Sequence, residues 1–330
     1  MVTGSREPTS VIRLLDLPHT EARRRLSEGA VAWITANPIE YHGPHLPLDT
    51  DRLQSLGWIE ALHAALDEPG EPLLCADLPL GVEPAPGPGS QPVSYARLRE
   101  AVTRAARSVE ELGARRVVIV TFHGSPLHNL ALHEVVVDLR RRGIAACAPF
   151  QEVVRLLLEP LDLERARQAV AHLEEPDAER VLADLGRDFH AGFFETSLML
   201  HWAPASVSPR HIELPPCPAV PRSRSMSALG RIAAAFGASG RAAELDFAAV
   251  ALGWQSLRPF PGYTGHPALA SADAGALFAD LVVERSAPPT RLALAGEPVG
   301  GPPLAWIGPL TAWGRLAPAP NVREVVELPR

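Results

Sequence analysis

The sequence predicts an α/β fold with a mainly parallel sheet and helices packed on both of its faces. Short runs of consecutive apolar residues alternate with longer segments of helical pattern through the first half of the chain. The runs are continuously apolar, whereas a strand with one face in water alternates apolar and polar residues. Continuous runs are typical of strands covered on both faces, and sheets covered in this way are mainly parallel.

Strands and helices are predicted in alternation, each from its own stretch of sequence. The first apolar run, VAWITAN, leads into a proline-containing turn, which suits a buried strand. The expected strands cover residues 31–37, 72–78, 116–122 and 144–149, and the helices between them cover residues 51–67, 94–113 and 126–142. Residues 150–200 and 271–286 also have a largely helical pattern. Because active sites in such sheets lie beyond the carboxyl ends of the strands, functional residues are expected just after the apolar runs.

The chain is expected to contain one catalytic domain, residues 1–286, and a C-terminal extension, residues 287–330. The 34 prolines and 25 glycines are not periodic, and they concentrate in loops between ordered elements and in the last part of the chain. The extension is rich in proline, glycine and leucine, so we interpret it as an appended lobe or an interaction arm.

Composition and charge exclude several classes of protein. The 330 residues are 46% hydrophobic and 21% charged, which is ordinary for a globular enzyme. The formal net charge of -7 argues against nucleic acid as a partner, because phosphate-binding proteins are usually basic. No apolar stretch reaches the roughly 20 residues of a membrane span, and the first residues lack the apolar run of a signal peptide. Cys75, Cys147 and Cys217 lie too far apart for a disulfide framework or a zinc knuckle. These features predict a cytoplasmic protein.

A cluster of metal-binding residue types follows the first expected strand. The segment PIEYHGPHLPLDTD, residues 38–51, contains two imidazoles and three carboxylates, namely Glu40, His42, His45, Asp49 and Asp51. Imidazole and carboxylate together are the ligands of zinc, manganese or iron, and a loop is able to converge them without helical spacing. The plainer interpretation is a polar loop in which Asp49, Thr50 or Asp51 caps the next helix.

Two further clusters contain histidines. TFHGSPLHN, residues 121–129, places His123 at the end of an expected strand, and Ser125 and Pro126 have the residue types of an N-cap and a first helical position. DFHAGFFETS, residues 188–197, contains His190 and Glu195 near a glycine. Taken singly, His123 is explained equally well as a structural residue and as a ligand, whereas a structural role is the better explanation of His128. For the third cluster taken alone, the better explanation is a helix whose Glu195 forms a surface ion pair.

Together, the clusters resemble the creatininase family. The resemblance rests on E-x-H-G-P-H-L-P-L-x-T-D, on a strand-ending histidine followed by glycine, on H-A-G-x-x-E-T-S, and on YTGHPALASADAG at residues 263–275. It spans about residues 30–286. Members of this family include creatinine amidohydrolases, a deformylase and a peptidase, so the resemblance implies hydrolysis of a C–N bond. It also implies a single α/β structure that assembles as a homo-oligomer, often a hexamer.

The resemblance also implies roles for individual residues. Glu40 and His42 match ligands of two adjacent divalent metal ions, Asp51 matches the carboxylate that bridges them, and His123 matches the histidine on the first metal. His190 matches a histidine near the scissile bond, where it would carry a proton to the leaving nitrogen. Two such ions, expected as zinc, manganese or iron, lower the pKa of a shared water and polarise the amide carbonyl.

Three departures from the family pattern bear on the substrate. Ser125 stands where creatinine-hydrolysing members have a glutamate, so one ligand of the second metal is left open, with Glu195 or His128 as the candidates. Residues 186–188 lack the aromatic wall expected for creatinine, and His266 replaces a usual aspartate. We therefore expect a small amide, formamide or peptide-like substrate other than creatinine. The alternatives are a metal-dependent lyase or ring-opening enzyme of secondary metabolism, and a non-catalytic scaffold that lacks metal.

Overall fold

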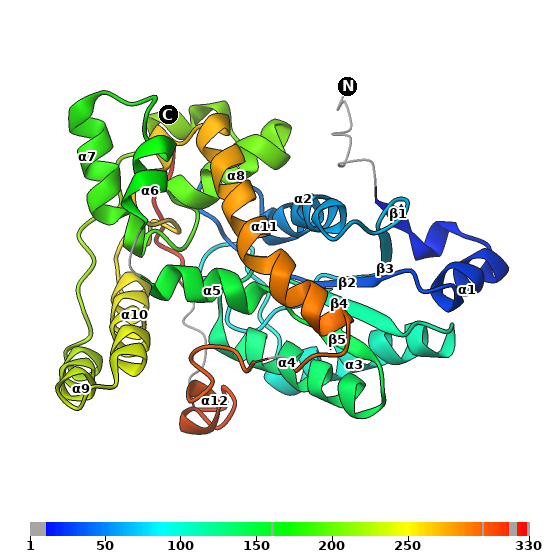
Figure 1. Cartoon of the computed structure of the whole chain (residues 1–330). Coiled ribbons are helices and arrows are strands. Elements are labelled where there is room, and N and C mark those ends of the chain that lie inside the picture. The colour runs from blue at the N-terminus through cyan, green and yellow to red at the C-terminus, as the bar shows by residue number, and fades with distance from the viewer. Residues whose placement is uncertain (1–10, 160–161, 299, 317–321, 329–330) are drawn as a thin grey trace.

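The central feature of the computed structural model is a five-stranded parallel sheet (Figure 1). The structure describes residues 11–159, 162–298, 300–316 and 322–328. The strands are β1 Ile12–Arg13, β2 Ala32–Ala36, β3 Leu73–Leu78, β4 Arg116–Val120 and β5 Ala145–Cys147, in the order β1-β3-β2-β4-β5. Ala32 of β2 is in register with Leu73 on one side and with Val117 on the other. The predicted parallel sheet is confirmed, and so are its expected strands.

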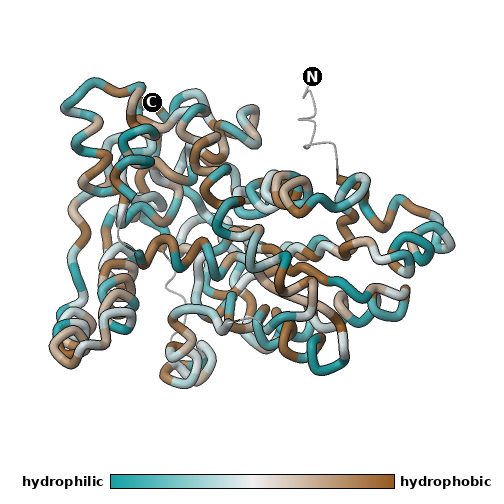
Figure 2. The backbone as a smooth tube through the Cα atoms, viewed as in Figure 1, coloured by the Kyte–Doolittle hydropathy of each residue, from teal (hydrophilic) through white to brown (hydrophobic). Residues whose placement is uncertain are grey.

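Alternate residues of each central strand enter two separate cores, one on each face of the sheet. Trp33 and Val118 belong to the core beneath α2 (Thr50–Ala65) and α11 (Ala272–Leu294). Ile34 and Ile119 belong to the core beneath α3 (Tyr95–Glu111) and α4 (Pro126–Arg141). All four side chains are fully buried. Hydrophobic residues accordingly concentrate along the central strands (Figure 2). This two-sided burial is the physical reason why the strands read as continuous apolar runs.

Helices cover both faces of the sheet, with α2 and α11 on one face and α3 and α4 on the other (Figure 1). Helices α2 to α8 and the first part of α11 lie where helical pattern was predicted. The helices are α1 His19–Ser27, α2 Thr50–Ala65, α3 Tyr95–Glu111, α4 Pro126–Arg141, α5 Phe150–Leu158, α6 Leu163–Ala169, α7 Glu175–Asp184, α8 Phe193–Trp202, α9 Arg224–Ala235, α10 Ser239–Gln255, α11 Ala272–Leu294 and α12 Ile307–Leu310. No helix within the described residues is long and apolar enough to cross a bilayer.

The C-terminal part of the chain differs from the expected arm. Helix α11 continues past residue 286 to Leu294, and Ala287, Ala293 and Leu294 are buried in the core above the sheet. Near the end of the chain, Phe260 donates its amide to Glu324 O at 2.8 Å, and Val326 donates to Phe260 O at 3.0 Å. Residues 322–328 therefore lie against the body of the protein. The division of the chain at residue 286 stays a prediction, although that position falls inside a helix.

The connections of the sheet open a crevice at its carboxyl edge. After β2 the chain passes through α2 to β3, whereas after β4 it passes through α4 to β5, on the opposite side of β2. The two connections thus diverge from neighbouring strands, and such a point is where ligands bind in open parallel sheets. The first two histidine-containing clusters leave β2 and β4 at this point.

Candidate metal centre

Asn37, the first residue after β2, ties together the elements that surround the crevice. Its Oδ1 accepts hydrogen bonds from Ser55 Oγ of α2 at 3.0 Å, from Thr121 Oγ1 at 3.2 Å and from Phe122 N at 3.1 Å. The side chain is buried, so these bonds hold the ends of β2 and β4 and the start of α2 in one fixed arrangement. Sequence reasoning missed Asn37, because a single amide after an apolar run carries no local sign of this role.

Glu40, Asp51 and His123 converge in a buried group at the ends of β2 and β4. Each contributes one potential ligand atom, and these atoms lie within 4.8 Å of one another. His123 Nδ1 lies 2.7 Å from Glu40 Oε2 and 3.8 Å from Asp51 Oδ2. Asp51 lies in the first turn of α2, and Asp49, not Asp51, occupies the N-cap position. The helix-capping interpretation of Asp51 is therefore wrong.

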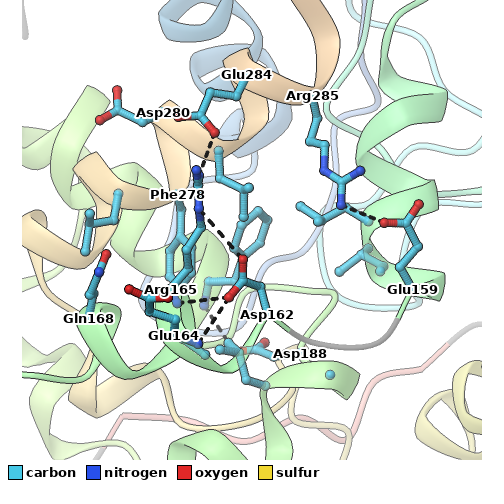
Figure 3. Close-up of a pocket in the computed structure, with 18 residues that line it drawn as sticks. Glu159, Asp162, Glu164, Arg165, Gln168, Asp188, Phe278, Asp280, Glu284 and Arg285 are labelled. Atoms are coloured by element: carbon cyan, nitrogen blue, oxygen red, sulfur yellow. Dashed lines mark hydrogen bonds and ion pairs between the residues drawn. The ribbon is translucent and has the colours of Figure 1, made fainter.

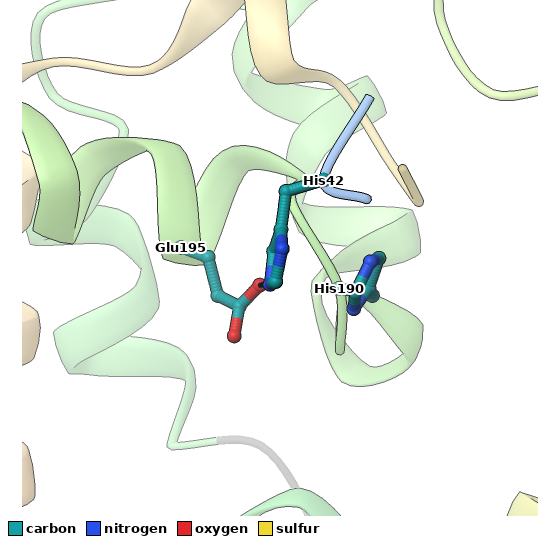
Figure 4. Close-up of side chains that lie close together, drawn as sticks. All are labelled: His42, His190 and Glu195. Atoms are coloured by element: carbon teal, nitrogen blue, oxygen red, sulfur yellow. Dashed lines mark ion pairs between the residues drawn. The ribbon is translucent and has the colours of Figure 1, made fainter. Parts of the chain in front are cut away.

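His42, His190 and Glu195 form a second buried group beside the first (Figure 4). The two imidazole rings are stacked, with centroids 4.3 Å apart and an angle of 24° between their planes. His42 Nε2 lies 3.8 Å from Glu195 Oε2 and 3.4 Å from Asp51 Oδ1. Asp51 thus turns one oxygen toward each group, which is the arrangement of a carboxylate that bridges two cations.

Main-chain carbonyl groups set the orientation of all three histidines. His42 Nδ1 donates to Glu40 O at 3.1 Å, His123 Nε2 donates to Val82 O at 2.9 Å, and His190 Nε2 donates to Tyr41 O at 3.0 Å. A carbonyl oxygen only accepts, so the proton of each neutral imidazole lies on the nitrogen that makes this bond. The other nitrogen then presents a lone pair to the carboxylates, as metal-binding histidines do.

The donor set fits divalent cations. Glu40 Oε2, His42 Nε2 and Asp51 Oδ2 are buried and have no hydrogen-bond partner within the described residues. Burial lowers the pKa of His42 and of His123, but the carboxylates outweigh it and raise the two values to about 10 and about 9. Burial also raises the pKa of Glu195 to about 8. Lone pairs and carboxylates so close together require a positive charge between them, and a metal ion supplies it in place of these protons.

The comparison with known families decides the identity. The sequence model described as creatinine amidohydrolase, of the creatininase family, matches residues 16–288. The chain belongs to the creatininase family. The resemblance found in the sequence is thereby confirmed, and the protein is an amidohydrolase. Among curated proteins, none matches this sequence.

Solved creatininase structures share the fold at low sequence identity. A creatinine amidohydrolase (creatininase) aligns with a TM-score of 0.55 and 18% identity over 87% of this chain and 99% of its own. A structure described as creatininase Mn aligns with a TM-score of 0.53 and 19% identity over 84% and 96%. A mutant creatininase complexed with creatine aligns with a TM-score of 0.53 and 18% identity over 86% and 98%. At these identities the likeness establishes the fold alone.

The remaining polar residues of the motifs have structural contacts. His128 Nε2 donates to Ala36 O at 3.1 Å and its Nδ1 accepts from Val82 N at 3.4 Å, so neither nitrogen is left for a metal ion. His45 Nε2 donates to Thr196 Oγ1 at 2.9 Å and anchors the start of α8. His266 Nε2 lies 2.9 Å from Asp184 Oδ2, outside both groups. As expected, Ser125 caps α4, with its Oγ accepting from His128 N.

A cavity of about 130 Å³ opens beside the two groups, lined by Glu40, His123, His190 and Glu195 among others. Phe189 and two residues of α10, Phe247 and Trp254, form an aromatic side of this cavity. The Trp254 ring lies 4.9 Å from the ring of His190. An aromatic wall is thus present, although residues 186–188 do not provide it. The absence of aromatic residues at 186–188 therefore does not argue against creatinine.

A second cavity, of about 640 Å³, lies among α5, α6 and α11 (Figure 3). Its two arginines are paired with carboxylates, since Arg165 Nη1 lies 2.6 Å from Glu284 Oε2 and Arg285 Nη2 lies 2.6 Å from Glu159 Oε2. None of the candidate metal ligands is among the described residues that line it. The chemistry of this family therefore belongs to the smaller cavity.

Proposed function

We propose that this protein hydrolyses a C–N bond of a small amide with a water molecule activated by two divalent metal ions. The observation that supports this most directly is the pair of adjoining ligand groups, with Asp51 directed at both, at the carboxyl edge of the sheet. Glu40, Asp51 and His123 would hold one ion, and His42, Asp51 and Glu195 the other. When bound, such ions lower the pKa of water and polarise a carbonyl group.

His190 differs in its surroundings from His42, the other histidine of its group, and we assign it to proton transfer. Its ring lies against Trp254 and lines the cavity, whereas His42 and Asp51 are not among the residues that line it. Its Nδ1, which faces the carboxylates, is 3.9 Å from Glu40 Oε1. A histidine placed between the metal-binding residues and the cavity is suited to deliver a proton to the leaving nitrogen.

The substrate class is a small molecule that carries an amide, cyclic amide, formamide or peptide-like bond. The small cavity volume, about 130 Å³, favours a compact reacting group, and the aromatic side chains favour a flat one. Creatine is the molecule bound in one of the related structures, so creatinine belongs in any test. That the protein is cytoplasmic stays a prediction from its sequence.

Metal content and a substrate panel test the proposed function. We expect the purified protein to contain two equivalents of zinc, manganese or iron by elemental analysis, lost with its activity after dialysis against a chelator. Creatinine, formamides, cyclic amides and dipeptides are then incubated with the metal-loaded protein, and the products are weighed by mass spectrometry. A product heavier by one water supports hydrolysis. A product of elimination would indicate a lyase, and full folding without metal would indicate a scaffold.

We also propose that the protein is a homo-oligomer, with a hexamer as the expected assembly. Leu229 and Ile232 of helix α9 and Phe236, the residue that follows it, are 47%, 54% and 86% exposed. Exposed apolar side chains gathered in this way are typical of an interface. Light scattering at micromolar concentration is expected to give a multiple of the 35.4 kDa chain mass. Ile232→Asp is expected to lower that mass, and a monomeric native protein would refute the proposal.

A further inference from the structure

Glu83 brings an additional carboxylate to the cavity from the loop after β3. Its side chain lines the cavity together with His123, Ser125 and Glu195. Sequence reasoning did not select Glu83, because it lies outside the family motifs. Glu83 is of interest because it contacts Ser125. Ser125 stands where creatinine-hydrolysing members of the family carry a glutamate. Through this contact a carboxylate still lies beside the cavity next to this position, although it is not in either ligand group.

The backbone of Glu83 is held in an unusual conformation. Its φ is 56°, in the left-handed region that side chains other than glycine rarely adopt. On either side of it, Val82 O accepts from His123 Nε2 at 2.9 Å and Ala85 N donates to Glu40 Oε1 at 2.5 Å. The loop is therefore fastened to two candidate metal ligands at once. Left-handed residues of this kind persist where the surrounding structure imposes them, and they concentrate at functional sites.

One oxygen of the Glu83 carboxylate is occupied and the other is available. Ser125 Oγ donates to Oε2 at 2.8 Å, which fixes the orientation of the group. No hydrogen bond from another described residue reaches Oε1. Burial raises the pKa of Glu83, while the bond from Ser125 and the charge of His123 act in the opposite direction. A partly buried carboxylate with one unsatisfied oxygen gains most from a ligand that donates an N–H or O–H group.

We propose that Glu83 is a specificity-determining residue that accepts a hydrogen bond from an N–H group of the substrate next to the scissile bond. This rests on the proposed function, because the metal-binding groups fix where the substrate carbonyl lies. The site then selects compounds that carry an N–H beside the carbonyl over their N-alkylated analogues. Ser125 is a positioning residue that acts through Glu83.

A matched pair of small chelating ligands tests this assignment without knowledge of the natural substrate. Acetohydroxamic acid has an N–H beside its carbonyl group, whereas N-methylacetohydroxamic acid has a methyl group in its place. Both are titrated calorimetrically into the metal-loaded protein. We expect the native protein to prefer the N–H ligand by about 10- to 100-fold, the range for a hydrogen bond to a charged group.

The variants are chosen to keep the fold while removing the carboxylate. Glu83→Gly and Glu83→Asn both tolerate a left-handed backbone, so they are expected to melt at or above the native temperature with full metal content. Both should lose the preference for the N–H ligand. Ser125→Ala should weaken the preference by a smaller factor. Glu111→Gln, on the exposed surface of α3, removes a carboxylate elsewhere and is expected to retain the preference.

Each outcome separates this assignment from the proposed function. Equal binding of the two ligands by the native protein, or a preference that survives in Glu83→Gly, would overturn the role of Glu83 alone. Loss of metal from Glu83→Gly and Glu83→Asn would make Glu83 a metal ligand and would also overturn it. Failure of the metal-loaded native protein to bind either hydroxamate would refute the metal-centred site and, with it, this inference.

Discussion

Asp51→Ala is expected to lose both metal ions and nearly all activity while the protein stays folded. Asp51 turns Oδ1 toward His42 Nε2 at 3.4 Å and Oδ2 toward His123 Nδ1 at 3.8 Å, so its removal affects both ligand groups together. Without this carboxylate, two cations would face each other with less negative charge between them. The fold should survive, because burial of a carboxylate is itself unfavourable and Asp51 makes no cap of α2.

Asp49→Ala is the matched control for this prediction. Asp49 lies two residues earlier, at the N-cap position of α2, and is not in either ligand group. We expect Asp49→Ala to keep both ions and to lose less than about 1 kcal/mol of stability, because its side chain makes no capping hydrogen bond to α2 and its ion pair with Arg52 lies near the surface. Elemental analysis and a melting curve on the same samples distinguish the two variants. Full metal content in Asp51→Ala would contradict the bridging role.

His190→Asn is expected to keep both metal ions and to lower the rate by about 10²- to 10⁴-fold, the contribution of a positioned acid or base. Asn is polar and close in size to the inner half of the imidazole, but it does not titrate, so the substitution removes the proton carrier. Its amide lies at the position of Nδ1, so the bond from Nε2 to Tyr41 O at 3.0 Å is lost together with the ring. The measurements are metal content and the pH dependence of kcat, which should lose one limb.

Glu195→Gln provides the contrast, because a metal ligand and a proton carrier respond differently. Glu195 Oε2 lies 3.8 Å from His42 Nε2 and accepts a hydrogen bond from Ala191 N at 2.6 Å. We expect Glu195→Gln to lose one ion of two and most of the activity. If His190→Asn lost an ion instead, His190 would be the ligand that completes the group with His42. Two ions retained in Glu195→Gln would remove Glu195 from the ligand set.

The buried strands were predictable because two-sided burial leaves a direct trace in the sequence. Trp33 and Ile34 enter opposite cores, so neither position tolerates a polar residue, and the run stays apolar. Strand β1, Ile12–Arg13, has only two residues at the sheet edge and leaves no such trace. For helix α11, helical pattern was expected only over residues 271–286, whereas Pro288 and Pro289 lie inside the helix. In the structure it passes through both of them to Leu294.

The candidate site was predictable where its residues follow one another in a motif. Glu40, His42 and Asp51 stand in one short segment, and the rule for parallel sheets places His123 beside them. Asn37, Glu83 and Trp254 were not selected, because their roles depend on contacts between segments far apart in the chain. Glu83 meets Ser125, and Trp254 meets His190, only after the chain has folded. Local patterns carry no information about such contacts.

The carbonyl groups that orient His42, His123 and His190 have a consequence for how such a protein evolves. The acceptors belong to the main chain of Glu40, Val82 and Tyr41, and every amino acid carries the same carbonyl group. Substitutions at Tyr41 or Val82 that keep the path of the chain therefore leave the imidazole tautomers unchanged. Side chains around the cavity are then able to change during evolution and so alter the substrate. The direction of each imidazole lone pair stays the same as long as the path of the backbone is kept.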